Sequence, residues 1–303
     1  MKLLNNIETE SFTTINFVSS DAKRIWKPII RRCTELVQKL ELVSVAKNQR
    51  RCAWRTVKVN EIEKLTRECM DLGLNTYPIQ NIGSWGQGFT HKTKPAIDGK
   101  PMSTYCIITK SIEDALEYQA AFSKADHAKQ GRMLGFPKCC TGFFLKNWPK
   151  YFDPIWQCAT NSNHNGGEFG KNIIELHDYN PLANPILRYI GLRVGFHIPC
   201  SFNCEESVSI AMERLSLNKD KDDTDLKRIL GHLLYMPMEW SVLNGIALIK
   251  TPIFYLRANS VPAIEKYTVR LHGDFIPREA VSGPGFPFNK SNSKINNLRR
   301  MHE

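Results

Sequence analysis

Two short segments of the chain each place a pair of cysteines just after a proline. Residues 135–144 read GFPKCCTGFF, and residues 197–204 read HIPCSFNC. Proline is favoured in the first turn of a helix, so both segments predict helix starts. The backbone N–H groups and the dipole of a helix N-terminus stabilise thiolates. We therefore expect a fold that brings two helix N-termini together around one metal site, with these ligands: Cys139, Cys140, Cys200 and Cys204.

The spacing of the cysteines bears on which metal they would bind. Cys200 and Cys204 lie one helical turn apart and can share a metal centre. Cys139 and Cys140 are adjacent, and on a helix their side chains point about 100° apart, which suits a single small ion poorly. Zinc prefers four ligands at about 2.3 Å in a tight tetrahedron, whereas a cubane spreads its irons over several ångströms. This reasoning favours a [4Fe–4S] cluster, with zinc as the alternative.

Two further residues are candidates for a catalytic role. His197 lies just before Cys200, where it could replace one cysteine as a ligand or orient a substrate. Alternatively, it is a strand-end histidine bonded to the backbone. Glu239, in MPMEW, could act as a general acid or base, but a helix cap is the competing interpretation. Weaker candidates for binding are His177, Asp178, Arg188 and Arg193.

The remaining cysteines are isolated in the sequence. The segment MKLLNNIETESF lacks the apolar stretch of a secretory signal, and no apolar run approaches the roughly 18 residues of a membrane span. We therefore expect a cytoplasmic protein with no membrane contact, in which a reducing environment keeps thiols free. Each isolated cysteine is then expected to be a small buried hydrophobe. These residues are Cys33, Cys52, Cys69, Cys106 and Cys158.

The positive charge of this basic protein is concentrated at the front of the chain. The formal net charge is +11, and residues 1–60 contain twelve Lys or Arg against five Asp or Glu. Residues 20–42 predict a helix with an apolar side and a basic remainder. A phosphate-rich partner such as tRNA or DNA would suit this surface, and a solvated basic face is the alternative.

The order of predicted elements indicates an α/β or α+β fold, a mixed sheet with flanking helices. We expect a basic amino-terminal α/β portion over residues 1–104, a cysteine-cluster metal-binding domain over 105–275 and a flexible polar tail over 276–303. Residues 76–103, rich in Gly, Pro and Thr, are expected to form a long loop, and residues 218–228 a charged linker.

The metal-binding portion is expected to mix helices and strands. Residues 137–148 and 204–217 predict the two helices that begin at the cysteines. Between them, residues 151–170 are expected to be irregular, and a strand is expected to end at Pro199.

Three blocks of this portion resemble a prokaryotic family of uncharacterised function. They are ADHAKQGRMLGFPKCCTGFF, NPILRYIGLRVGFHIPCSFNCEESVSIA and MPMEWSVLNGIALIKTPIF, and the similarity around them covers roughly residues 105–257. The resemblance carries no known activity, but it implies a single constellation of Cys139, Cys140, His197, Cys200, Cys204 and Glu239. Asn244 stands where the family pattern leads us to expect a histidine.

A looser likeness points to paired-cysteine iron–sulfur redox modules. The vicinal cysteines are similar to those in the Cys-Cys-Gly domains of heterodisulfide-reductase-type proteins and in the queuosine-precursor reductases. Here Thr141 replaces the glycine, and the second pair has the spacing C-x3-C. The likeness supports a cluster only by analogy.

The sequence therefore favours a cysteine-ligated metal enzyme, an iron–sulfur-dependent oxidoreductase or transferase. It would perform redox, sulfur-transfer or Lewis-acid chemistry on a small molecule or a modified nucleotide. The alternative is a nucleic-acid-binding protein with a structural zinc site. An enzyme needs an open coordination position or a free thiol, whereas a structural zinc site is closed.

Overall fold

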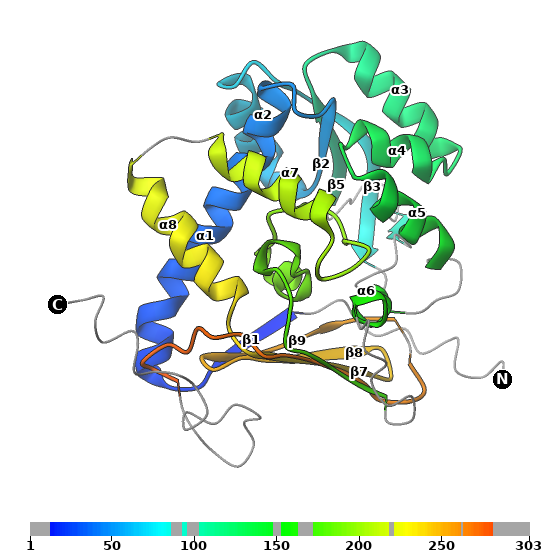
Figure 1. The fold of residues 1–303 in the computed structure, drawn as a ribbon. Helices are drawn as coiled ribbons and strands as arrows, with labels where there is room; N and C mark the ends of the chain where they lie inside the picture. The colour runs from blue at the N-terminus through cyan, green and yellow to red at the C-terminus, as the bar shows by residue number, and fades with distance from the viewer. Residues whose placement is uncertain are drawn as a thin grey trace.

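The structure, a computed structural model, describes residues 13–85, 93–95, 103–147, 153–162, 172–217, 221–261 and 263–280. Within these ranges the chain forms two β-sheets and the helices that pack on them (Figure 1). One sheet combines parallel and antiparallel pairs, and strands do not alternate regularly with helices along the chain. The fold is therefore α+β with a mixed sheet and flanking helices, which confirms one of the two expected classes.

Sheet A has six strands, and its β6–β10 pair is parallel whereas its other described pairs are antiparallel. Strands β7 and β8 are joined by Asn244 and Gly245, which both have positive φ angles, of 49° and 80°. Asn-Gly is the favoured pair for such a two-residue hairpin turn, so Asn244 has a conformational role here. In spatial order the strands are β1 (Thr13–Phe17), β9 (Phe254–Asn259), β8 (Ile246–Lys250), β7 (Met238–Leu243), β10 (Tyr267–Leu271) and β6 (Ile173–Leu176).

Sheet B has four strands and occupies part of the region that was predicted to be a loop. Residues 76–103 were expected to be irregular, but residues 75–85 form strand β3. The prediction was wrong because Pro78 is tolerated at a register shift between Pro78 and Gln80, where the ladder is already interrupted. In spatial order the strands are β2 (Cys52–Lys58), β5 (Ser103–Thr109), β3 (Asn75–Trp85) and β4 (Thr93–Pro95).

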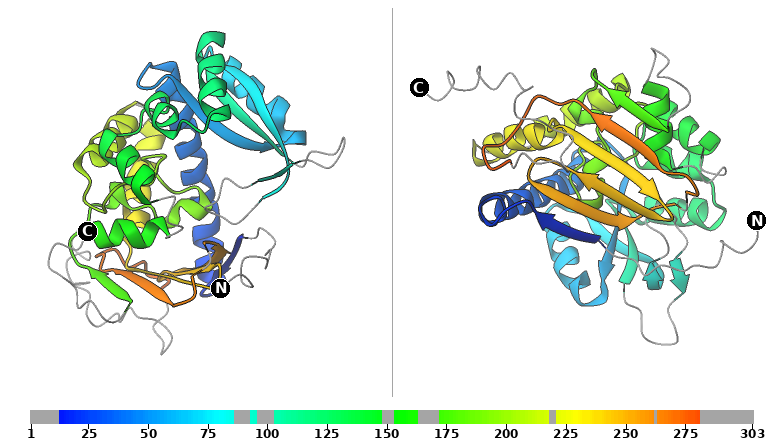
Figure 2. Two further views of the ribbon diagram at one scale, coloured as in Figure 1. Left: turned by 90° about the vertical axis from the view of Figure 1, so that its right-hand side faces the viewer. Right: turned by 90° about the horizontal axis from the view of Figure 1, so that it is seen from below.

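Helix α1 (Ser20–Ala46) connects the two sheets. Ser19 caps its first turn by accepting a hydrogen bond from the Ala22 N–H, as a serine at this position should. Its first half buries Trp26 and Ile30 against the core above sheet A, and its last turns bury Val45 against the core beside sheet B. In Figure 2 (left) the helix runs from one sheet to the other. The predicted helix over residues 20–42 is thus confirmed and is longer than expected.

The other helices fall into two groups by their position relative to the sheets. The helices α2 to α5 lie near sheet B, and α6 to α8 lie above sheet A (Figure 1). Their bounds are α2 (Ile62–Met70), α3 (Ile112–Ser123), α4 (His127–Met133), α5 (Lys138–Asn147), α6 (Pro154–Ser162), α7 (Glu205–Ser216) and α8 (Lys221–Leu234). The two helices predicted to begin at the cysteines, α5 and α7, are both present.

Three segments of the metal-binding portion differ from the prediction. Residues 151–170 contain α6, and the Asp153 carboxylate caps it by accepting from the Ile155 N–H. Residues 218–228 contain the first turns of α8, where Asp225 and Arg228 are exposed while Leu226 is buried. The stretch before Pro199, which was expected to be a strand, is a loop. It follows a short 3-10 helix that ends at Gly191. In all three segments the local composition led to a wrong prediction of secondary structure.

The two sheets divide the chain differently from the expected domains. The boundary at residues 104 and 105 lies inside strand β5. Strand β1, from the basic front, pairs with β9 in sheet A. The domain division remains a prediction from composition, and most of the expected tail over residues 276–303 lies outside the described residues.

Candidate metal centre

The four predicted cysteines lie together. The Cys139 sulfur is 3.8 Å from the Cys140 sulfur and 3.7 Å from the Cys204 sulfur. The Cys140 and Cys204 sulfurs are 3.6 Å apart, and the ligand atoms of all four cysteines, Cys200 included, lie within 4.8 Å of one another. The sulfurs of the adjacent pair therefore do not diverge in the way that was expected of neighbouring helix residues. The four thiols can hold a metal ion.

Two chain segments bring these sulfurs together. Cys139 and Cys140 lie in the first turn of α5, while Cys204 is the residue that caps the start of α7. Cys200 belongs to the loop that precedes α7. Cys140 and Cys204 are buried, Cys200 is partly buried and Cys139 is exposed. The cluster therefore lies at the edge of the core, with one side open to solvent.

Hydrogen bonds converge on the Cys140 sulfur in particular. The Cys200 N–H lies 3.3 Å from it, and the Ser207 hydroxyl lies 3.2 Å from it. The Cys200 N–H donates to this sulfur, and such a donor stabilises a thiolate and orients a ligand around a metal. The backbone of one cysteine segment thus supports a sulfur of the other.

The thiols differ in how easily they ionise. The Cys140 thiol and the Ser207 backbone N–H donate to the Cys204 sulfur and lower the pKa of Cys204 to about 4. Burial and the charge on Cys204 raise the pKa of Cys200 to about 12. The bond to Cys204, together with burial, also raises the pKa of Cys140. Several thiolates at this spacing repel each other, so full ionisation requires a cation among them.

His197 lies behind the cluster and does not belong to the group of ligand atoms. Its Nδ1 atom is 2.6 Å from the Gly195 carbonyl, which can only accept, so we assign the ring proton to Nδ1. Its Nε2 atom then accepts from the Ser207 hydroxyl at 2.8 Å. Burial lowers the pKa of His197 to about 3, so the ring is neutral. His197 therefore reaches Cys140 only through Ser207, in the manner of an outer-sphere residue.

The space beside His197 is too small for a substrate. A cavity of about 10 Å³ adjoins His197, Ser207 and Pro199, and it has room for one water molecule at most. The predicted catalytic role of His197 stays a prediction, and the contacts described here are those of a positioning residue.

Two buried arginines hold the loop that leads to Cys200. Phe196 has a positive φ of 57°, which is strained for a bulky residue. The Arg214 guanidinium lies 4.6 Å from its ring centroid, and the Arg50 guanidinium lies 5.0 Å from it. Arg214 also donates to the Val194 carbonyl at 3.2 Å and to the Gly195 carbonyl. These contacts secure the strained loop immediately before His197.

Arg50 also positions the other cysteine segment. Gly135 has a φ of +67°, and a Cβ atom at this position would lie 2.8 Å from the Arg50 Cβ. Glycine is therefore required where the chain turns into α5. The Arg50 side chain is buried and is bonded to the Glu41 carbonyl at 2.8 Å. One arginine thus contacts the approaches to both halves of the cluster.

The loop that contains Cys200 and Cys204 is tied to two other elements. The Asn161 side chain at the end of α6 donates to the Cys200 carbonyl at 2.9 Å. The Asn203 side chain donates to the Asp178 carbonyl at 3.0 Å, just beyond β6. Sequence reasoning missed α6 although a capping aspartate followed by proline at the first helical position is a helix-start signal.

Glu239 lies in a row of ion pairs across sheet A. Its carboxylate is 3.1 Å from the Lys250 ammonium on β8 and 2.9 Å from the Arg270 guanidinium on β10. Burial alone would raise the pKa of Glu239, but the hydrogen bonds from Arg270 and Lys250 lower it. The carboxylate therefore stays ionised and has no proton to donate near neutral pH. Its predicted role as a general acid or base stays a prediction.

The weaker candidates are scattered through the fold. Burial lowers the pKa of Arg188 to about 10 and also lowers that of Arg193. His177 lies near His272 and Glu175 at the edge of sheet A. The isolated cysteines are buried and free, as expected.

Comparisons with protein-family models, with curated proteins and with solved structures find no match to this chain. The resemblance in the cysteine blocks therefore stays an expectation from the motifs. Among the described residues, no helix is both long enough and apolar enough to cross a membrane.

Proposed function

We propose that the four cysteines bind one tetrahedral zinc ion that holds α5 and the start of α7 together. The separations of 3.6–3.8 Å among the Cys139, Cys140 and Cys204 sulfurs carry this proposal, and the Cys200 sulfur lies within 4.8 Å of each of them. Four thiolates at about 2.3 Å from one zinc lie about 3.8 Å from each other. In a cubane each cysteine binds a different iron, so the sulfurs must stand farther apart, at roughly 6 Å. The separations therefore favour zinc over the [4Fe–4S] cluster that the cysteine spacing suggested.

The ligand set supports a structural rather than a catalytic metal. Four thiolates complete a tetrahedron and leave no position for substrate, which is typical of structural zinc sites. The His197 imidazole is bonded to Gly195 and Ser207 and is not among the grouped ligand atoms. The site therefore supports a binding protein whose fold depends on zinc, and gives less support to redox or sulfur-transfer chemistry.

Metal analysis tests this assignment directly. We expect anaerobically purified protein to contain one zinc per chain, no acid-labile sulfide and no visible absorbance. A brown protein with about four iron and four sulfide per chain would instead establish the cubane. Copurified iron without sulfide would indicate a mononuclear iron site and would overturn the choice of zinc.

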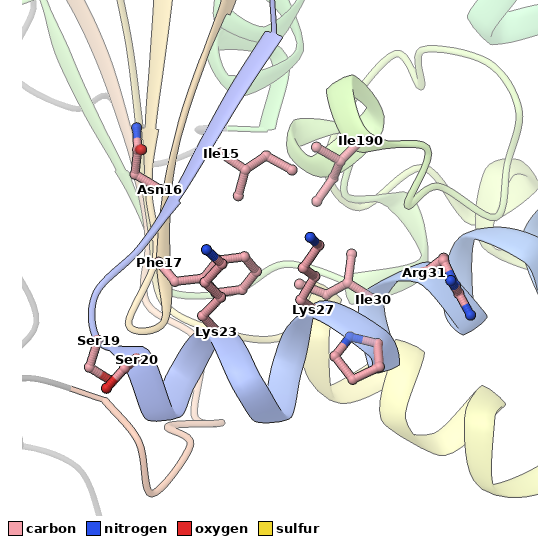
Figure 3. A pocket seen from close by; sticks show the side chains of 11 residues that line it. Ile15, Asn16, Phe17, Ser19, Ser20, Lys23, Lys27, Ile30, Arg31 and Ile190 are labelled. Atoms are coloured by element: carbon pink, nitrogen blue, oxygen red, sulfur yellow. The ribbon is translucent and has the colours of Figure 1, made fainter.

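A basic groove on α1 indicates the partner. The groove has a volume of about 980 Å³ and lies between β1 and the first half of α1 (Figure 3). Lys23, Lys27 and Arg31 line it from α1 at four-residue intervals, so they share one face of the helix about 6 Å apart. The apolar side chains of Ile15 and Phe17 line it from β1, and no acidic residue is among the described residues that line it.

We propose that this groove binds single-stranded nucleic acid. A row of cations beside the exposed Ile15 and the partly buried Phe17 suits a phosphate backbone whose bases lie against the apolar wall. The groove lies within residues 1–60 apart from Ile190, so it supports the predicted nucleic-acid binding by this part of the chain. A small-molecule or nucleotide substrate has no comparable support from the cysteine site.

Charge reversal in the groove tests the partner. We expect the double variant K23E/K27E to bind a fluorescent single-stranded RNA at least about tenfold more weakly at low salt, measured by anisotropy. The slope of log K against log salt should shrink by roughly 1.4, because each phosphate that a lysine neutralises on a single strand contributes about 0.7. The matched control K64E/R67E reverses two exposed charges on α2 and should retain most of the affinity. Equal losses of affinity in both variants would mean that the RNA responds to the overall charge of the protein and does not bind in the groove.

A further inference from the structure

A second group of metal-ligand side chains lies at the edge of sheet A. Strands β6 and β10 are parallel, with Leu176 opposite Leu271, so their carboxyl ends lie at the same edge. His177 and His272 each follow directly after these paired residues, and Glu175 lies two residues before His177 on the same face of the strand. The ligand atoms of the three residues lie within 4.8 Å of one another.

The contacts of Glu175 leave one carboxylate oxygen directed at the histidines. Its Oε1 atom accepts from Arg270 at 3.0 Å, and its Oε2 atom lies 3.2 Å from the His272 Nε2 atom. The same Oε2 atom is 4.0 Å from the His177 Nε2 atom. Arg270 is in turn bonded to Glu239, which fixes its position. A charged group that orients a ligating carboxylate is typical of the outer sphere of metal sites.

The two histidine rings are adjacent and accessible. Their centroids are 4.0 Å apart and their planes differ by 16°, so the rings are stacked. All three ligand side chains are exposed, and the His177 side chain is 71% exposed. The strands of sheet A lie in front of the helices when the molecule is seen from below (Figure 2, right). Solvent can therefore reach the group, and an exposed ring can rotate so that both Nε2 atoms face one ion.

We propose that Glu175, His177 and His272 form a second metal site, which binds a divalent transition-metal ion such as Zn²⁺ or Co²⁺. Two imidazoles and one carboxylate are a ligand set of such ions, whereas Mg²⁺ and Ca²⁺ prefer oxygen ligands alone. Three protein ligands leave at least one coordination position for water, unlike the closed cysteine site. The site is therefore open where the cysteine centre is closed.

This inference does not depend on the zinc proposal. The two groups share no ligand and differ in chemistry, since one is made of thiolates and the other of imidazoles and a carboxylate. Co²⁺ distinguishes them, because thiolate ligands produce intense near-ultraviolet charge-transfer absorbance and imidazole and carboxylate ligands do not. The failure of either proposal is therefore visible separately.

Cobalt titration of the full-length, tag-free protein tests the site. We expect wild type to bind one Co²⁺ without thiolate absorbance, in addition to any ion at the cysteines. The double variant H177A/H272A should bind this ion at least about tenfold more weakly, and E175Q should weaken it while keeping the side-chain shape. Calorimetry gives the affinity, and circular dichroism shows whether each variant is folded.

Controls and contrary results are equally specific. The variant H127A removes a histidine on α4 and should leave the affinity unchanged. If wild type binds no Co²⁺ outside the cysteines, or if H177A/H272A binds it as tightly as wild type, the second site does not exist. If metal-free wild type binds the second Co²⁺ but shows no thiolate absorbance, only the cysteine proposal is contradicted.

Discussion

Replacing Cys140 with serine is expected to abolish zinc binding and to destabilise the protein severely. Cys140 contacts the Cys139 and Cys204 sulfurs, and it accepts from Cys200. A serine hydroxyl does not ionise near neutral pH and is a poor zinc ligand. Structural zinc binds with apparent free energies of about 10–16 kcal/mol, and that energy belongs to folding. We expect C140S to contain little zinc and to lose at least about 5 kcal/mol of unfolding free energy, measured by urea denaturation.

Another buried cysteine provides the matched control. Cys106 is fully buried on β5, and its thiol contacts the Thr104 carbonyl at 3.9 Å. The variant C106S makes the same atomic change away from the cluster, so it should keep one zinc and lose only about 1–2 kcal/mol. Chelation of zinc from wild type should reproduce the C140S defect. A C140S protein with a full complement of zinc would show that the cysteines are not the ligands.

The second large effect is expected at Arg214. This side chain is buried, stacks on Phe196 and donates to two loop carbonyls. Alanine would leave buried carbonyls without a donor and would remove one of the two guanidinium groups that contact the strained Phe196, at a cost of about 3–5 kcal/mol. Because the same loop leads to Cys200, zinc affinity should also fall. Urea denaturation and competition with a chromophoric chelator measure the two effects.

Two other arginine variants test whether the planar donor group of Arg214 matters beyond its positive charge. R214K keeps the positive charge but not the planar donor group, so an intermediate loss of stability is expected. R228A removes an arginine on α8 whose side chain is 58% exposed, and it should change stability by less than about 0.5 kcal/mol. If R214A were as stable as R228A, the loop would not depend on Arg214.

The cysteine site could be predicted because its signals are local. A proline beside a cysteine pair indicates a helix start, and both α5 and α7 begin where the motifs placed them. Ser111 is a local signal of the same kind, because its side chain caps α3 by accepting from the Asp114 N–H. Such features depend on neighbours along the chain, which sequence displays directly.

The elements that were missed show where local composition fails. Strand β3 contains Pro78, and α8 begins in the charged run KDDTD. In both cases tertiary contacts outweigh intrinsic preference, because one face of each element is buried. The hairpin at Asn244 and Gly245 was also missed, although its turn signal is present in the sequence.

The sequence by itself determined which four cysteines could hold a metal ion and where the helices beside them start. Only the tertiary structure decided how far apart the sulfurs lie, because Arg50 and Arg214 hold both approaches to the site through contacts distant in the chain. The same is true of His177 and His272, which meet only because β6 and β10 pair in parallel. Residue type limits the chemistry that is possible, whereas metal choice depends on distances that long-range packing sets.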